Sequence, residues 1–195
     1  METLVWGLAG KYCAGKNRAG RFLEEEGCIL VDADRLGHQV LEENRQELVR
    51  RFGPAALDER GQVDRRALGA LAFRDPATLK ELESLVHPPV IARIEEIIRE
   101  NPGRIVVINA ALLFSSRLHL RCSRVLWITA PLAVRFFRGL RRDRMSPVKV
   151  FRRIWVQRKL SPQPWRKDVD IYTIPNPGNE EILRRGIRNF LERVK

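Results

Sequence analysis

Residues 3–34 read TLVWGLAGKYCAGKNRAGRFLEEEGCILVDAD, and the order of residue types in this stretch decides the fold. An apolar run from Thr3 to Leu8 precedes a glycine-rich turn, and apolar residues then recur at helical spacing until Gly27. A second apolar run, Cys28 to Val31, ends in DAD, residues 32–34. Buried strand, turn, helix and buried strand in this order predict a right-handed parallel crossover.

The glycine-rich turn is GKYCAGKN, residues 10–17, which follows the phosphate-loop pattern G-x-x-x-x-G-K. A strand that enters a helix through glycines points backbone N–H groups and the positive helix end at one place, which suits phosphate oxygens. Lys16 would add its charge to the terminal phosphates. The other interpretation is an ordinary glycine-rich turn. Because the pattern lies between the first strand and a helix, we favour phosphate binding.

Asn17 occupies the position where a phosphate loop usually has Ser or Thr, whose hydroxyl contacts Mg²⁺. An amide oxygen is an acceptable hard ligand, but it sits on a longer side chain. We therefore expect Asn17 to weaken or rearrange metal binding rather than abolish it.

Asp32 and Asp34 follow the second strand at its carboxyl end, which in an open parallel sheet faces the ligand crevice. Carboxylates two residues apart lie on the same side of an extended chain. One could accept the proton of an acceptor hydroxyl, and the other could hold a metal-bound water. The alternative is that Asp34 only caps a helix beginning at Arg35.

The composition describes a globular chain of 195 residues with 44% apolar and 31% charged residues, enough for one core and a small inserted subdomain. Three widely spaced cysteines are typical of reduced thiols, and neither a leader nor a membrane-length apolar run is visible. We therefore expect a cytoplasmic protein that is not attached to a membrane.

The net charge of +12 is concentrated in one segment, Arg135 to Lys167, called the basic segment below. This segment holds twelve Lys or Arg and a single acid, Asp143, whereas the rest of the chain is nearly neutral. Such a block attracts polyanions, either nucleic acid or a small multiply phosphorylated ligand. A solvated helical face is the remaining interpretation.

The residues from Arg35 to Glu100 show helical spacing and no clear strand, which predicts a helical insertion that could hold an acceptor substrate. Asp64 and Asp75 are expected helix caps, and a break is expected before Pro89. Further strands are expected over 104–110, 124–129 and 170–174, and helices over 131–144, 147–157 and from Asn179 to the end. We expect His38 and His119 to be surface or helix-face residues rather than ligands, and Trp155 and Trp165 to pack in the core rather than stack on a base.

Several motifs together resemble the dephospho-coenzyme A kinase family over nearly the whole chain. They are GLAGKYCAGKN, VDAD, FG…LDERGQVDRRAL…FRD, LVHP, ALLF, RGLRRDRMS, RRIWVQ and PNPGN, in this order. The resemblance implies an α/β P-loop nucleoside-kinase-like fold with a five-stranded parallel sheet. Its expected parts are a core (1–34, 104–134, 168–195), an acceptor-binding insertion (35–103) and an Arg-rich lid (135–167). It also implies transfer of the γ-phosphate of ATP to the ribose 3′-hydroxyl of dephospho-coenzyme A, with Mg²⁺.

The resemblance also implies roles for single residues. Asp34 matches the general base, Lys16 the loop lysine and Arg142 a lid arginine, with Arg138 and Arg153 beside it. Asn176 matches the turn near the adenine, and Asp32, Arg65 and His87 match positions around the acceptor. The expected ATP-binding residues are Gly10, Lys11, Tyr12, Cys13, Ala14, Gly15, Lys16, Asn17, Arg18, Arg138, Arg142 and Asn176, with Asn17 as a metal ligand.

The chain also departs from the family pattern. Lys11 and Tyr12 replace Gly-Ile, and the stretch NAALLFSS, residues 109–116, lacks the usual carboxylates and proline. Asn17, Asn109 and Ser115 thus favour an alternative, a nucleotide-binding relative with impaired catalysis. A nucleic-acid binder is a third possibility that we disfavour, since the basic segment accompanies a phosphate loop. We expect a monomer or a weak homo-oligomer.

Overall fold

The computed structural model describes residues 3–72 and 74–194, and these residues form two compact units. The first comprises Met1–Val31 and Ile98–Lys195, and the second Asp32–Ile97. None of the described helices is long and apolar enough to cross a membrane. The first unit contains the phosphate loop and the basic segment, and the second contains the helical insertion.

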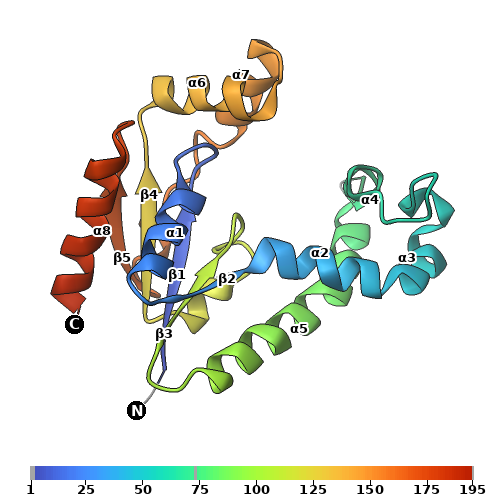
Figure 1. Ribbon diagram of the computed structural model, residues 1–195. Coiled ribbons are helices and arrows are strands. Elements are labelled where there is room, and N and C mark those ends of the chain that lie inside the picture. The colour runs from blue at the N-terminus through green and yellow to red at the C-terminus, as the bar shows by residue number, and fades with distance from the viewer. Residues whose placement is uncertain (1–2, 73, 195) are drawn as a thin grey trace. The chain divides into compact units, whose positions relative to one another are not determined.

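A five-stranded parallel sheet forms the centre of the first unit, as the sequence predicted (Figure 1). Its strand order is β2-β3-β1-β4-β5, so β1 lies in the middle with β3 and β4 as its neighbours. The register pairs Leu8 with Asn109 of β3 and with Leu126 of β4. The strands are β1 (Leu4–Gly10), β2 (Ile29–Asp32), β3 (Ile105–Asn109), β4 (Arg124–Thr129) and β5 (Asp170–Pro175).

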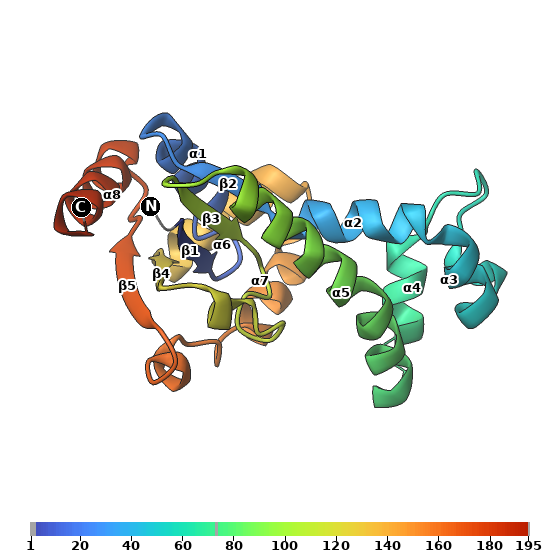
Figure 2. The same ribbon diagram turned by 90° about the horizontal axis from the view of Figure 1, so that it is seen from below.

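The helices α1 (Lys16–Glu25) and α8 (Glu180–Val194) cover one face of this sheet (Figure 2). Their apolar stripes pack on buried strand residues, where the Trp6 and Phe190 rings meet edge to face at 5.0 Å. Asn179 caps the start of α8 as predicted, because its Oδ1 accepts a hydrogen bond from the Glu181 amide at 2.8 Å. This packing fixes α1 on the sheet, and with it the end of the phosphate loop from which α1 begins.

The opposite face of the sheet carries an aromatic cluster near Trp127. Phe114 stacks on Trp165 with their ring centroids 5.7 Å apart, and His119 lies 5.0 Å from Trp165. His119 is only 1% exposed, so it is not the surface residue that was one of the two expected positions. The short η2 (Leu118–Arg121) places this ring among aromatic side chains, and η3 (Gln163–Trp165) supplies Trp165.

The basic segment forms α6 (Leu132–Asp143) and α7 (Pro147–Val156). Ser146 precedes α7 at the expected cap position, although its side chain makes no capping hydrogen bond. Trp155 is 54% exposed and stacks on Phe151, so its predicted place in the core was wrong. Figure 1 shows both helices beyond the end of the sheet that carries the phosphate loop.

The second unit consists of α2 (Ala33–Glu43), α3 (Arg45–Phe52), η1 (Pro54–Ala56), α4 (Arg65–Ala72) and α5 (Pro76–Glu100). Its own apolar cluster centres on Leu48, Val63 and Leu68. Asp64 and Asp75 accept backbone amide hydrogen bonds at the starts of α4 and α5, as predicted. The expected helix over 65–73 ends at Ala72, and Phe73 lies outside the described residues.

The predicted break before Pro89 was wrong, because α5 continues through Pro88 and Pro89. A proline in a helix interior removes one backbone hydrogen bond and crowds the preceding turn, at a cost of about 3 kcal/mol. Residues on both sides of the prolines are packed: Leu82 and Leu85 against the second unit's cluster, and Val90 and Ile94 in buried positions. Burial of these side chains offsets the cost of the prolines.

Candidate nucleotide-binding site

The phosphate loop turns at Gly15, which precedes α1 with φ 100°, in the left-handed region that favours glycine. A Cβ at this position would overlap Nδ2 of Asn176, so only glycine fits. Lys16 and Asn17 then begin the first turn of α1, and backbone N–H groups at the start of a helix point along its axis toward a bound anion. The positive end of α1 therefore lies where the sequence predicted phosphate binding.

Carbonyl groups of three consecutive loop residues point at side chains from other elements. The Tyr12 carbonyl accepts from Nε of Arg135 at 2.8 Å, and the Ala14 carbonyl accepts from Nδ2 of Asn176 at 2.8 Å. Nη1 of Arg138 lies 3.4 Å from the Cys13 carbonyl. These donors fix the backbone of the loop through its carbonyl groups.

Arg138 and Asn176 also bind each other, with Nη2 of Arg138 2.9 Å from Oδ1 of Asn176. Asn176 is only 2% exposed, and its backbone amide donates to the Thr129 carbonyl at 2.7 Å. Burial lowers the pKa of Arg138, and it also lowers the pKa of Arg135. Both guanidiniums nevertheless stay charged at neutral pH, because arginine is not deprotonated in proteins. Arg138 and Asn176 thus brace the loop, a role that their motifs did not reveal.

The C-terminal part of α6 and α7 contacts the loop at Tyr12. Oε1 of Gln157 accepts from the Tyr12 amide at 2.5 Å, and the Tyr12 hydroxyl donates to the Asp143 carboxylate. Nζ of Lys11 donates to the Arg158 carbonyl at 3.2 Å. The structure thus links Arg142 to the loop through Asp143 and Tyr12, and its predicted contact with the phosphates stays a prediction.

Beside Tyr12 lies a cavity of about 540 Å³, lined by three cations and by apolar atoms, without a carboxylate. This lining suits a phosphorylated ligand that also has an apolar part. The lining residues are Tyr12, Met145, Lys149, Arg152, Arg153, Val156 and Gln157.

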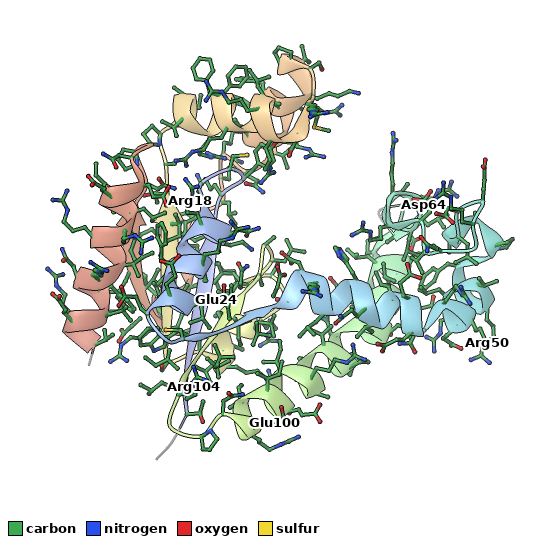
Figure 3. All side chains as sticks on the ribbon, in the orientation of Figure 1. Arg18, Glu24, Arg50, Asp64, Glu100 and Arg104 are labelled. Atoms are coloured by element: carbon green, nitrogen blue, oxygen red, sulfur yellow. The ribbon has the colours of Figure 1, made fainter. Side chains whose placement is uncertain are left out.

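Arg18 is exposed and forms an ion pair with Glu180 of α8 at 2.8 Å. Figure 3 labels Arg18 near the start of α1, with Glu24 further along the same helix. The structure therefore directs Arg18 to the neighbouring helix, and its predicted contact with ATP stays a prediction.

Asp32, rather than Asp34, caps the helix that follows the second strand. Oδ1 of Asp32 accepts from the Arg35 amide at 3.0 Å, and α2 already begins at Ala33. The alternative interpretation of Asp34 as a simple cap was therefore wrong. Asp34 lies exposed in the first turn of α2.

Other predicted acceptor-binding residues lie in the second unit with Asp34. Nη1 of Arg65 lies 2.9 Å from the ring nitrogens of His38, which is one helical turn after Asp34. His87 is half-buried in α5, directly before Pro88. Arg65 and the face of α2 that carries Asp34 are thus brought together, and His38 joins them although the sequence suggested only a surface position for it.

The residues fit a magnesium ion that also binds substrate phosphates. Asn17 is exposed at the start of α1, and Asn109 ends the strand beside β1 with its Oδ1 buried and without a partner among the described residues. Within residues 3–72 and 74–194, no three His, Cys, Asp or Glu side chains gather as metal ligands. Mg²⁺ usually takes one or two protein oxygens together with phosphates and water.

A glycine loop between the central strand of a 2-3-1-4-5 parallel sheet and a helix defines a P-loop protein of the kinase-like α/β class. A family model described as CoaE: Dephospho-CoA kinase matches residues 4–176. The chain therefore belongs to the dephospho-CoA kinase family.

Individual relatives agree with this assignment. The chain is 34% identical over 198 residues to a dephospho-CoA kinase of Treponema pallidum, covering 96% of this chain and 93% of that one. It is 33% identical over 191 residues to the Moorella thermoacetica enzyme, covering 94% and 89%. Matches to proteins of the same name from Borrelia garinii and Borreliella burgdorferi span 63% of their lengths.

Among solved structures, TT1252 from Thermus thermophilus superposes with a TM-score of 0.85 at 29% identity, over 100% of both chains. The dephospho-CoA kinase from Campylobacter jejuni superposes with a TM-score of 0.68 at 24% identity, over 98% and 97%. At 24% identity, the match to the Campylobacter jejuni structure supports a shared fold and nothing more.

Proposed function

We propose that this chain transfers the γ-phosphate of ATP to the ribose 3′-hydroxyl of dephospho-coenzyme A, forming coenzyme A and ADP. The observation that carries the proposal is the phosphate loop at the positive end of α1, whose carbonyl groups are braced by Arg135, Arg138 and Asn176. A loop held in this way presents its N–H groups without reorganisation when phosphate arrives, which is how phosphoryl transfer is stabilised.

In this proposal the 3′-oxygen attacks the γ-phosphorus while the bond to the β–γ bridging oxygen breaks. Asp34 accepts the hydroxyl proton, and Lys16 with the first-turn N–H groups of α1 holds the β- and γ-phosphates. Arg142 neutralises charge that develops on the transferred group. Asp32, Arg65 and His87 hold the acceptor, and the cavity beside Tyr12 accommodates phosphorylated substrate.

Mg²⁺, when bound, would neutralise charge across the β- and γ-phosphates. Asn17 would hold it from the protein side, with Asn109 as the other amide oxygen at this edge of the sheet. Both are neutral donors, so we expect weaker metal binding than with a carboxylate. The basic segment acts as an Arg-rich lid over the phosphates, and the cytoplasm is the proposed compartment.

The decisive experiment measures coenzyme A formation from dephospho-coenzyme A and ATP with Mg²⁺, and then with Mn²⁺. Asp34→Asn should abolish turnover, because no base remains for the hydroxyl proton, while calorimetry still detects ATP binding. Asp170→Asn is the matched control, since Asp170 is exposed at the amino end of β5, and it should leave turnover unchanged. Absence of product from the unmodified chain with both metals would refute the proposed activity.

The neutral donors Asn17 and Asn109 favour one second candidate, a relative that binds nucleotide but has impaired catalysis. The same assay separates the two. ATP binding without product, with product appearing in Asn17→Ser, would support the impaired relative over the active kinase.

A further inference from the structure

The Tyr12 side chain joins the phosphate loop to the end of α6. Its hydroxyl donates a hydrogen bond to the Asp143 carboxylate, and its ring packs directly over Gly139. A Cβ at Gly139 would lie 3.1 Å from the Tyr12 hydroxyl oxygen, so the glycine makes room for the ring. Burial, followed by the hydrogen bond to Asp143, raises the pKa of Tyr12 to about 12, so the hydroxyl stays a donor at any physiological pH.

Asp143 binds two arginines at the same time as Tyr12. Its Oδ1 accepts from Nε of Arg142 at 2.7 Å, and its Oδ2 accepts from Nη1 of Arg153 at 3.0 Å. The guanidinium carbons of Arg142 and Arg153 lie 5.1 and 5.7 Å from the centroid of the Tyr12 ring. The Tyr12 ring thus faces two guanidinium groups, while its hydroxyl binds the carboxylate that both arginines also contact. Such contacts are cooperative, because each one restricts the side chains that make the others.

This cluster restricts side chains that would otherwise be mobile. An arginine side chain has many rotamers, so it loses entropy when it is fixed in one of them. Asp143, at the end of α6, is the single acid of the basic segment and so its one carboxylate that can bind these arginines. Arg142 donates to Asp143 from Nε and Nη2, and a guanidinium bound along that edge still has N–H groups on its other edge. A guanidinium fixed in this way is oriented before a phosphate reaches it.

We propose that Tyr12 is a positioning residue, whose contact with Asp143 forms a latch that holds Arg142 and Arg153 beside the phosphate loop. The inference rests on the proposed phosphoryl transfer at this loop. It assigns a role to the side chain of Tyr12, whereas the phosphate-loop pattern concerns only the backbone at this position. The latch acts through Arg142, so it affects the transferring phosphate more than the binding of the acceptor.

The test compares Tyr12→Phe, Asp143→Asn and the double variant, with Tyr172→Phe as matched control. Tyr172 is the other tyrosine of the chain, and its ring packs on Phe190 within the sheet's core. Tyr12→Phe should lower kcat about tenfold, the effect of losing one hydrogen bond to a charged group. The KM for dephospho-coenzyme A should stay within about twofold, because acceptor binding is not involved.

Because the two side chains act as one latch, the double variant should lose about as much kcat as Asp143→Asn alone. Two independent losses of about tenfold each would instead multiply and lower kcat about a hundredfold. Hydrogen exchange of the ligand-free protein gives a readout that needs no activity. Amides of residues 139–157 should exchange about tenfold faster in Tyr12→Phe than in Tyr172→Phe.

The outcomes separate the latch from the proposed function. If the unmodified chain forms no coenzyme A, the proposed function fails and hydrogen exchange alone decides on the latch. If coenzyme A forms and Tyr12→Phe retains full kcat, the latch is refuted, whether or not exchange changes. Independent losses in the double variant, or equal losses in Tyr172→Phe, would also refute it.

Discussion

Gly15 shows how one residue sets the geometry of the phosphate loop. Its φ of 100° is costly for any other L-residue, and a Cβ would displace the Asn176 side chain, whose amide nitrogen occupies that space. Asn176 in turn binds Arg138 and the Ala14 carbonyl. A side chain at Gly15 therefore disturbs the whole brace and not only the local backbone.

We predict that Gly15→Ala weakens ATP binding at least about tenfold and destabilises the chain by about 1–3 kcal/mol, through strain and the displaced Asn176. Gly27→Ala is the matched control, since Gly27 has φ 91° but, apart from Gly27 and its two chain neighbours, no described residue has a heavy atom within 4 Å of where its Cβ would be. The control should lose about 1 kcal/mol in thermal unfolding and keep its ATP affinity in calorimetry. Equal ATP affinity in both variants would contradict the proposed importance of the brace.

At the same scale, the sequence predicted the loop but not the side chains that hold it. The pattern G-x-x-x-x-G-K reflects backbone requirements that recur whenever a strand enters a helix through such a turn. The contacts of Tyr12 with Asp143, and of Arg135 with the loop, join residues more than a hundred positions apart. No local sequence pattern predicts such contacts. The one signal was that Asp143 is the single acid in the basic segment, where it can bind the surrounding arginines.

The boundaries of the helices show where local sequence rules failed to predict the structure. Helix α2 begins at Ala33 because Asp32, still in the strand, supplies the capping oxygen. Sequence spacing alone could not decide between two capping aspartates two residues apart, since either can accept an amide. In α5 the rule that prolines end helices was outweighed by burial on both sides of Pro88 and Pro89. The strands, in contrast, were predicted well because continuous apolar runs bounded by turns are typical of a buried parallel sheet.

The end of α6 carries a pH-dependent contribution to stability. Hydrogen bonding to Arg142, the largest cause, and then to Tyr12 lowers the pKa of Asp143 from its ordinary value of 3.8 to about 2, against the opposing effect of burial. A carboxyl group whose pKa is lower in the folded state stabilises the fold above its unfolded pKa. This contribution is complete above about pH 4 and disappears as the pH falls through about 2.

We therefore predict that Asp143→Asn has a lower thermal unfolding midpoint than the unmodified chain at pH 5, and that the difference shrinks to a small fraction of this value at pH 2. Other carboxylates titrate in the same range, but they are shared by both proteins and cancel in the difference. A constant difference for Asp143→Asn from pH 5 to pH 2 would contradict the assigned contacts.

At the scale of the whole molecule, the chain divides into two units that each have an apolar cluster. The lack of strands led us to expect a helical insertion over residues 35–103, and the second unit spans Asp32–Ile97. The sequence did not predict that the insertion has a core of its own, because the apolar spacing of short helices does not say which partners they pack against. Units with separate cores can unfold separately, so a single unfolding transition is not guaranteed.

Leu48 is fully buried in the cluster of the second unit, where it packs with Val63 and Leu68. We predict that Leu48→Ala destabilises this unit by about 2–5 kcal/mol, through lost burial and the cavity left behind. Hydrogen exchange should accelerate over residues 32–97 while ATP binding at the loop stays within about twofold, since the loop belongs to the other unit. Coenzyme A formation should then require more dephospho-coenzyme A, because Asp34, Arg65 and His87 lie in the loosened unit.

Leu126→Ala is the control for this separation, because Leu126 is equally buried in β4 within the sheet's cluster. It should weaken ATP binding and accelerate exchange in the strands, because β4 pairs directly with the strand that leads into the phosphate loop. A Leu48→Ala protein that loses ATP affinity as strongly as Leu126→Ala, in one cooperative transition, would show that the two clusters unfold together. The acceptor and the nucleotide would then depend on a single unfolding equilibrium, and weaker use of dephospho-coenzyme A could not be attributed to the second unit alone.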